Sequence, residues 1–167
     1  ILVASLMAHA VLGERISAST IVATAGLSLG EYTALVAAGV LSFVDAVRLV
    51  RIRGEAMQAA AERVKSGMVA LIGADEVSAS AVCAEAAQGE VLQVANLNAP
   101  GQVVISGTAT ACERAIAVAK NHGIRKAIAL SVAGAFHSQL MQPAAERLRD
   151  ALAHVQRCDV QPILRIS

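Results

Sequence analysis

The sequence predicts a mixed α/β protein in which a small subdomain is inserted into a larger core. Predicted strands and helices alternate along the 167 residues, which favours an α/β class over an all-helical or all-strand one. Hydrophobic residues make up 56% of the chain, enough to fill a sizeable core. We therefore expect an α/β core over residues 1–65, a small subdomain over 66–132 and a return to the core over 133–167.

The first segment predicts helices around one short strand. Its opening stretch is apolar and unbroken until Gly13, which is typical of a core helix and lacks the positively charged start of a signal peptide. A run of apolar and β-branched residues then predicts a buried strand, and good helix formers follow it. The expected elements are a helix over 1–15, a strand over 21–25, a helix over 31–38 and a longer helix over 44–65.

The middle segment predicts the order β-α-β-β-α-β, which is a ferredoxin-like arrangement. Its two central strands are joined by a turn at Asn98-Ala99-Pro100-Gly101, whose residue types favour chain reversal. Glycines separate nearly all of its elements. These are expected as strand 68–73, helix 77–88, strands 91–95 and 102–106, helix 109–122 and strand 125–132.

The last segment predicts a loop over 134–137 and a helix over 138–154 that returns the chain to the core. Residues 163–166 then resemble a strand about to enter a turn. Because the chain also begins at Ile1 without an initiator methionine, we expect it to be a fragment of a longer protein, truncated at both ends.

Composition argues against several functional classes. A net charge of +1 and 2% aromatic residues leave neither a basic stripe nor stacking side chains for nucleic acid. The three cysteines are widely spaced and include no C-x-x-C pair, so neither a disulfide framework nor a zinc site is expected. The apolar runs are far shorter than the ~20 residues that a membrane span requires. We expect no metal, no nucleic acid and no membrane partner, and a cytoplasmic location.

The most informative motif is Gly26-Leu27-Ser28-Leu29-Gly30. The G-x-S-x-G spacing between a predicted strand and a predicted helix is typical of a turn that exposes a nucleophilic serine. The backbone N–H of Leu29 would face a developing oxyanion, close to the positive end of the following helix. Ser28 is therefore the candidate nucleophile, although an ordinary serine at the end of a strand fits the same local pattern.

Arg53 is the second candidate, because helical spacing places it on the apolar stripe of the 44–65 helix. A lone buried cation is unfavourable, so this guanidinium needs an anionic partner. Glu31 or Asp45 would make it a structural ion pair, and a substrate carboxylate would make it a binding residue. The sequence leaves both readings open.

His137 and Asn98 are weaker candidates. His137 lies in a loop at a predicted helix start, where a histidine serves either as a catalytic base or as a cap or packed core residue. Asn98 fits the turn before Pro100, and its amide is also suited to line a cleft.

Together these residues resemble the malonyl-CoA:acyl carrier protein transacylase family, within the acyltransferases of fatty acid and polyketide synthesis. The resemblance runs along nearly the whole chain and is highly specific. It rests on Gly26-Leu27-Ser28-Leu29-Gly30-Glu31-Tyr32, Arg53-Gly54-Glu55-Ala56-Met57-Gln58, Asn98-Ala99-Pro100-Gly101-Gln102-Val103-Val104-Ile105-Ser106-Gly107 and Ala135-Phe136-His137-Ser138. It implies an α/β-hydrolase-like core with an inserted ferredoxin-like subdomain.

The resemblance also implies a reaction and its residues. Ser28 would accept malonyl from coenzyme A as an ester and yield it to the phosphopantetheine thiol of an acyl carrier protein. His137 would be the general base, Arg53 would bind the malonyl carboxylate, and Phe136 would belong to an Ala-Phe-His run that accompanies malonyl use. Leu29 and Asn98 complete the expected substrate site. No cofactor is implied beyond the coenzyme A thioester as substrate, and we expect a monomer.

Three other interpretations stay open. The same serine turn serves esterases and thioesterases of the α/β-hydrolase type, and the same family includes acyltransferase domains of polyketide synthases. A non-catalytic domain that only docks a carrier protein would keep the cleft without the chemistry.

Leu27 stands where most bacterial members carry histidine and resembles plant and algal relatives, so a plastid is an alternative location.

Overall fold

The computed structural model describes residues 1–15 and 21–155. It is a mixed α/β structure, as the sequence predicts, with a four-stranded antiparallel sheet and six α-helices among the described residues. Its contacts divide the chain into two compact units, which we describe separately. Unit 1 comprises residues 1–54 together with the chain from Leu148 onward, and unit 2 comprises Glu55–Arg147.

Unit 1 is helical in its described part. It contains α1 (Leu2–Gly13), α2 (Leu29–Ala37), the first part of α3 (Phe43–Ala61) and the last part of α6 (Gln142–Ala153). Its buried core is a small apolar cluster, onto which Leu148 and Ala151 of α6 also pack. The cluster consists of Leu2, Tyr32, Leu41, Ala46 and Leu49.

The strand expected over 21–25 is wrong for the described structure. Residues 21–26 form neither helix nor strand. A strand is stabilised by a hydrogen-bonded neighbour, and all four described strands pair with one another instead. The segment is tied to the helix that follows it by Thr24, whose Oγ1 donates to the Ala34 carbonyl at 3.0 Å. The strand expected over 163–166 lies outside the described residues.

The sheet of unit 2 has the strand order β2-β3-β1-β4. The elements follow one another along the chain as β-α-β-β-α-β, with a short 3-10 helix, η2 (Ala119–His122), before the last strand. They are β1 (Ser66–Ile72), α4 (Glu76–Ala87), β2 (Leu92–Ala99), β3 (Gln102–Thr108), α5 (Ala109–Val118) and β4 (Lys126–Ala129). The strands β2 and β3 are joined by a tight turn at Pro100 and Gly101, with Gly101 at φ +76°.

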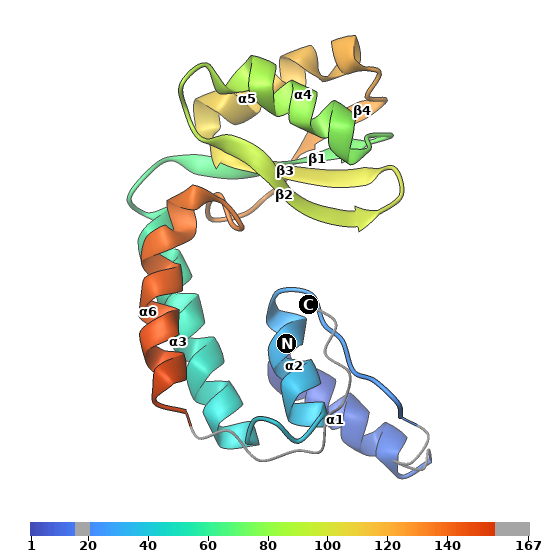
Figure 1. The fold of residues 1–167 in the computed structure, drawn as a ribbon, viewed down its shortest axis with the longest axis vertical. Coiled ribbons are helices and arrows are strands. Elements are labelled where there is room, and N and C mark those ends of the chain that lie inside the picture. The colour runs from blue at the N-terminus through green and yellow to red at the C-terminus, as the bar shows by residue number, and fades with distance from the viewer. Residues whose placement is uncertain (16–20, 156–167) are drawn as a thin grey trace. The chain divides into compact units, whose positions relative to one another are not determined.

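The core of unit 2 lies between one sheet face and the helices α4 and α5, which cover that face (Figure 1). Alternate residues of the two central strands point into it, so Val69 stands opposite Ile105 and Leu71 opposite Val103. Arg114 of α5 donates to the carbonyls of Ala86 and Ala87 at 2.7 and 2.8 Å, which satisfies the end of α4.

Unit 2 extends beyond the 66–132 segment that the sequence predicts for the subdomain. The last part of α3 packs with η3 (Gln139–Met141) and the start of α6 through a cluster that includes Ala56, Ala60 and Met141. This apolar contact joins the residues that precede the segment to those that follow it. The boundaries at 65/66 and 132/133 stay a prediction.

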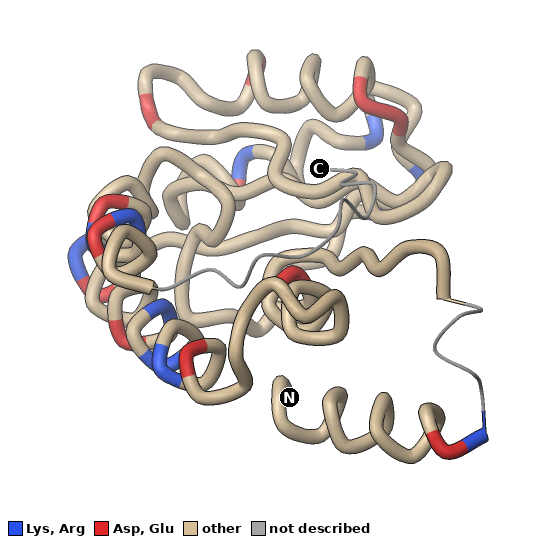
Figure 2. The backbone as a smooth tube through the Cα atoms, turned by 60° about the horizontal axis from the view of Figure 1, so that its bottom comes forward, with Lys and Arg blue, Asp and Glu red and all other residues tan. Residues whose placement is uncertain are grey.

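Charged residues are distributed unevenly over the helices (Figure 2). The helices α3 and α6 carry charges of both signs, whereas α1 carries no Lys, Arg, Asp or Glu. Several large apolar side chains of α1 are exposed, among them Met7 at 65%. Even so, no helix in the described ranges is both long enough and apolar enough to cross a bilayer.

Candidate active site

The turn that carries Ser28 is strained in the way a nucleophile turn requires. Ser28 has φ 54° and ψ −108°, a conformation that side-chain-bearing residues rarely adopt, and it caps α2 at its N-terminus. The Gly30 N–H donates to the Leu27 carbonyl at 2.9 Å and closes the turn. A Cβ on Gly26 would collide with the carbonyl group of Gly30, so only glycine fits there.

Leu29 is the first residue of α2, immediately after Ser28. Its backbone N–H belongs to the first helical turn, where N–H groups have no partner within the helix. No acceptor among the described residues takes this N–H. An N–H in this position, beside the serine, is suited to stabilise negative charge that develops on an acyl oxygen, and this role of Leu29 stays a prediction.

Arg53 reaches the serine. Its Nη2 donates to Ser28 Oγ at 2.6 Å, and both side chains are partly buried. Among the described residues no carboxylate forms an ion pair with Arg53. Asp45, one of the partners considered from sequence, accepts from Ser42 and faces Arg48 at 3.5 Å. The guanidinium is thus placed where it can meet a carboxylate carried by a group on Ser28.

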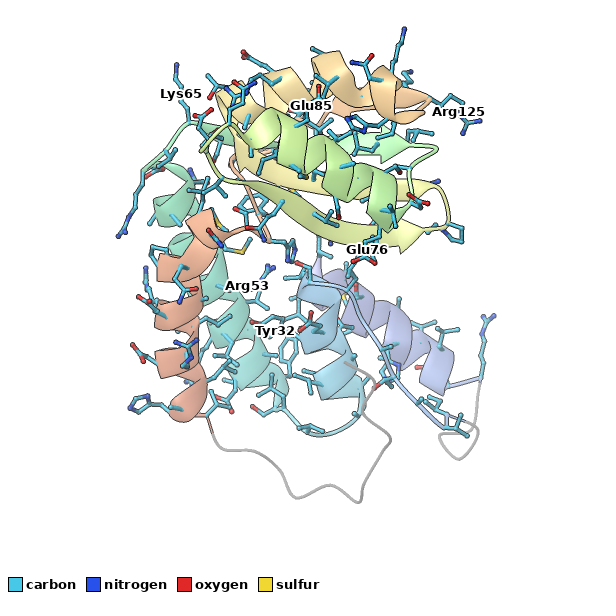
Figure 3. All side chains as sticks on the ribbon, turned by 45° about the horizontal axis from the view of Figure 1, so that its top comes forward. Tyr32, Arg53, Lys65, Glu76, Glu85 and Arg125 are labelled. Carbon is cyan, nitrogen blue, oxygen red and sulfur yellow. The ribbon has the colours of Figure 1, made fainter. Side chains whose placement is uncertain are left out.

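Tyr32 is a neighbour that the sequence does not single out. It lies one helical turn after Ser28 and is only 7% exposed, as part of the apolar cluster of unit 1. Arg53 belongs to the same unit (Figure 3). Burial raises the pKa of Tyr32, and the nearby positive charge of Arg53 partly opposes that rise. Its place four residues after the nucleophile is the sequence signal that could have found it.

His137 lies in unit 2, in the turn between β4 and η3. Its backbone φ is +58°, the left-handed region that non-glycine residues seldom occupy. The preceding Phe136 is half-buried and packs against the cluster formed by α3, η3 and α6. Ser138 Oγ donates to the Ala135 carbonyl at 2.6 Å across the turn. The imidazole is exposed, on a turn that is held by internal hydrogen bonds.

Asn98 also lies in unit 2, near the end of β2, and is exposed. The structure therefore brings together Ser28, Leu29 and Arg53 in unit 1. It places His137, Phe136 and Asn98 in the other unit. The catalytic and binding roles of all six residues remain predictions.

The parts of the chain that the structure describes offer no set of ligands for a metal ion. No group of three or more His, Cys, Asp or Glu side chains in those parts could hold a metal ion. Cys83 and Cys112 are buried free thiols, and burial raises the pKa of Cys83 to about 11. Such a thiol stays protonated near neutral pH and is a poor ligand and nucleophile.

A strained serine between two glycines, at the N-terminus of a helix and in contact with an arginine, is an arrangement that serine hydrolases and acyl transferases share. The chain belongs to the acyl transferase domain family, whose model matches residues 18–165.

Its relatives within this family are malonyl transacylases. The malonyl CoA-acyl carrier protein transacylase of Bacillus subtilis is 50% identical over 147 residues, which are 86% of this chain and 46% of that protein. The crystal structure of MCAT from Streptococcus pneumoniae superposes with a TM-score of 0.87 at 39% identity, over 96% of this chain and 52% of that one. The chain spans less than half the length of the curated relatives it matches.

A third neighbour was solved with its partner. A malonyl-transacylase in complex with a type II polyketide acyl-carrier protein has a TM-score of 0.75 at 43% identity, over 80% of this chain and 43% of that one.

Proposed function

We propose that the protein containing this chain is a malonyl-CoA:acyl carrier protein S-malonyltransferase of fatty acid biosynthesis. One observation carries the proposal: Arg53 Nη2 lies 2.6 Å from Oγ of a serine in a strained nucleophile turn. A cation that touches the nucleophilic oxygen can pair with an acyl group bearing its own carboxylate, and malonyl is such a group.

The reaction proceeds in two acyl transfers, first from the coenzyme A thioester to Ser28 as an ester and then from this ester to the carrier-protein thiol. Ser28 Oγ attacks the malonyl carbonyl while His137 takes the hydroxyl proton, and the Leu29 N–H stabilises the oxyanion. The C–S bond then breaks, and His137 returns the proton to the coenzyme A sulfur that leaves. In the second half the phosphopantetheine thiol of the carrier protein attacks the ester, its proton passes through His137 to Ser28 Oγ, and the hydroxyl is restored.

Arg53 sets the choice of acyl group in this scheme. A charge-assisted, bidentate bond to a carboxylate contributes about 1.5–3 kcal/mol net. An acetyl group has no anion to offer and gains none of this. Phe136 and Asn98 are proposed to line the same substrate site.

The finer fold proposal is an α/β-hydrolase-like core with a ferredoxin-like insert. The serine turn at the start of α2 supports the first part. The β-α-β-β-α-β order and the antiparallel strand order β2-β3-β1-β4 support the second.

We further propose a monomer that acts in the cytoplasm and needs no cofactor beyond its coenzyme A thioester substrate. The chemistry supports the last point, because a serine, an imidazole and an incoming thiol suffice for acyl transfer. The plastid alternative finds no support among the relatives named above.

Intact-mass measurement of the full-length protein after exposure to malonyl-CoA tests the proposal. A mass increase of one malonyl group is expected, its removal by holo acyl carrier protein is expected next, and Ser28→Ala should abolish both. A malonyl adduct that survives Ser28→Ala would show that another residue is the nucleophile. Neutral esters turned over faster than malonyl thioesters, with no effect of Arg53→Ala, would identify a hydrolase instead.

The polyketide complex among the neighbours motivates a second candidate, the same transfer to a carrier protein of polyketide synthesis. The two candidates share the serine ester and differ in its acceptor. Discharge rates measured with a fatty acid carrier protein and with a polyketide carrier protein separate them.

A further inference from the structure

The turn that carries His137 is anchored to the sheet of unit 2 at both ends. On the N-terminal side the Ala135 N–H donates to Oγ of Ser66, the first residue of β1, at 3.0 Å. On the C-terminal side the Gln139 N–H donates to Oε1 of Gln93, in β2, at 3.1 Å. His137 lies midway between Ala135 and Gln139, so each anchor is two residues from the imidazole.

Such anchors matter because this turn is unfavourable by itself. His137 has a positive φ, a conformation that costs a non-glycine residue of order 1–3 kcal/mol and persists only where the surroundings impose it. The arm before it is also fixed by packing, because a Cβ on Gly134 would lie 2.6 Å from Ala61 Cβ. The arm after it has no such close packing at Gln139, which is exposed.

We propose that Gln93 is a positioning residue for His137, acting through the Gln139 N–H. The inference rests on the proposed function, in which His137 is the general base. Gln93 is half-buried in a strand, and its side-chain carbonyl is the acceptor that the Gln139 N–H uses among the described residues. Without it, the arm after His137 loses its connection to the sheet, and the imidazole spends less time in its working orientation.

The expected signature is a loss of turnover without a loss of binding. Gln93→Leu keeps the size of the side chain and removes the acceptor. We expect the rate of malonyl-Ser28 ester formation at saturating malonyl-CoA to fall about 3- to 10-fold, the range that one neutral hydrogen bond supports. KM should stay unchanged, because Gln93 acts on the turn and not on the substrate. Gln93→Glu retains an acceptor oxygen and should restore most of the rate.

The same hydrogen bond can be removed from its other end. Gln139 is the first residue of η3, a position that tolerates proline, and Ser138 before it is extended at φ −124° and ψ 172°, as a residue preceding proline prefers. Gln139→Pro therefore deletes the N–H donor with little disturbance of the backbone. Its effect should match that of Gln93→Leu, and the double variant should be no slower than either single one.

Two controls complete the design. Gln102→Leu makes the same chemical change at an exposed position of β3 and should leave the rate unaltered. NMR of the His137 ring and amide exchange over residues 136–140 report on the turn without any reaction. Both Gln93→Leu and Gln139→Pro should broaden or shift the ring resonances and accelerate exchange.

The outcomes separate the two proposals. Absence of a malonyl ester on Ser28 in the unaltered protein would contradict the proposed function, while the NMR measurements would still test the turn. Unchanged His137 resonances and exchange in both variants would overturn the role of Gln93, whatever the activity. A slower rate that Gln93→Glu does not restore, or that is additive with Gln139→Pro, would overturn it as well.

Discussion

Ser28 and Arg53 are 25 positions apart and meet at a hydrogen bond. Helical spacing predicts that Arg53 faces inward, and the glycine pattern predicts the turn at Ser28. Neither pattern predicts that the two side chains are in contact, because that contact depends on the tertiary structure. Their contact makes the arginine the residue with which to test acyl specificity.

Replacing Arg53 by alanine should weaken the preference for malonyl-CoA over acetyl-CoA about ten- to a hundredfold, because the charge-assisted bond is lost for only one of the two substrates. The ratio of the two ester-forming rates in the full-length protein measures this. Arg48→Ala is the matched control, since Arg48 is an exposed residue of the same helix that faces Asp45. An unchanged ratio in Arg53→Ala would contradict the carboxylate-binding role.

Gly26→Ala should destabilise the protein and abolish ester formation. The added Cβ would overlap the backbone of Gly30, which cannot move without opening the serine turn. Gly54→Ala is the control, because a Cβ there meets nothing within 4 Å and alanine favours helix. Thermal denaturation with an ester assay at low temperature distinguishes a stability loss from a loss of chemistry. Normal stability and activity in Gly26→Ala would show that the turn has more room than its geometry indicates.

At the scale of elements, helices and sheet strands were predictable to within a few residues where the pattern was periodic. The helix expected over 44–65 is α3, which ends at Ala61, and the strand expected over 91–95 is β2, which runs on to Ala99. The strand expected over 21–25 failed because apolar β-branched residues indicate a strand but cannot supply its neighbour.

The site was less predictable than the elements. Gln93 reads in the sequence as a polar residue of a strand, and its hydrogen-bond partner is 46 positions away. Tyr32 is hidden in a helical pattern that any core aromatic would satisfy. Gln93 carries no local signal, because its contact forms only when distant elements pack together. For Tyr32 the local signal is its spacing of four residues from Ser28.

The two thiols of α4 and α5 predict a pH dependence. Burial raises the pKa of Cys83 from 9.0 to about 11, so the folded state binds this proton more tightly than the unfolded state does. The resulting stabilisation is complete below pH 9 and is lost as the pH rises through 11. Denaturant unfolding at pH 8 and pH 10.5 should show a drop in stability that is smaller in Cys83→Ala.

The comparison with Cys83→Ala isolates the thiol, because Tyr32, whose pKa is also raised by burial, titrates alike in both proteins. Slow alkylation of Cys83 by iodoacetamide in the native protein at pH 8 is expected for the same reason. An equal pH dependence in the two proteins would assign the effect to other groups.

At the scale of the whole molecule, the sheet with α4 and α5 has a complete apolar core of its own. We predict that residues 62–132 fold alone and unfold in one cooperative transition. Ile105→Ala, at a fully buried position of β3, should lower the stability of this piece by about 2–5 kcal/mol. Ile116→Ala, on the exposed side of α5, should change it little. Circular dichroism during thermal unfolding measures both, and a broad non-cooperative transition would contradict the prediction.

The first and last strands of this sheet are neighbours: Val69 pairs with Ala129, and the Leu130 N–H donates to the Met68 carbonyl at 2.9 Å. The chain therefore enters the sheet and leaves it at neighbouring positions. Linking those two ends would need only a short peptide, because the entropy of closing a small gap is modest. Residues 62–132 are thus suited to circular permutation, with new ends opened at the Pro100–Gly101 hairpin, or to exchange as a unit between related acyl transferase domains.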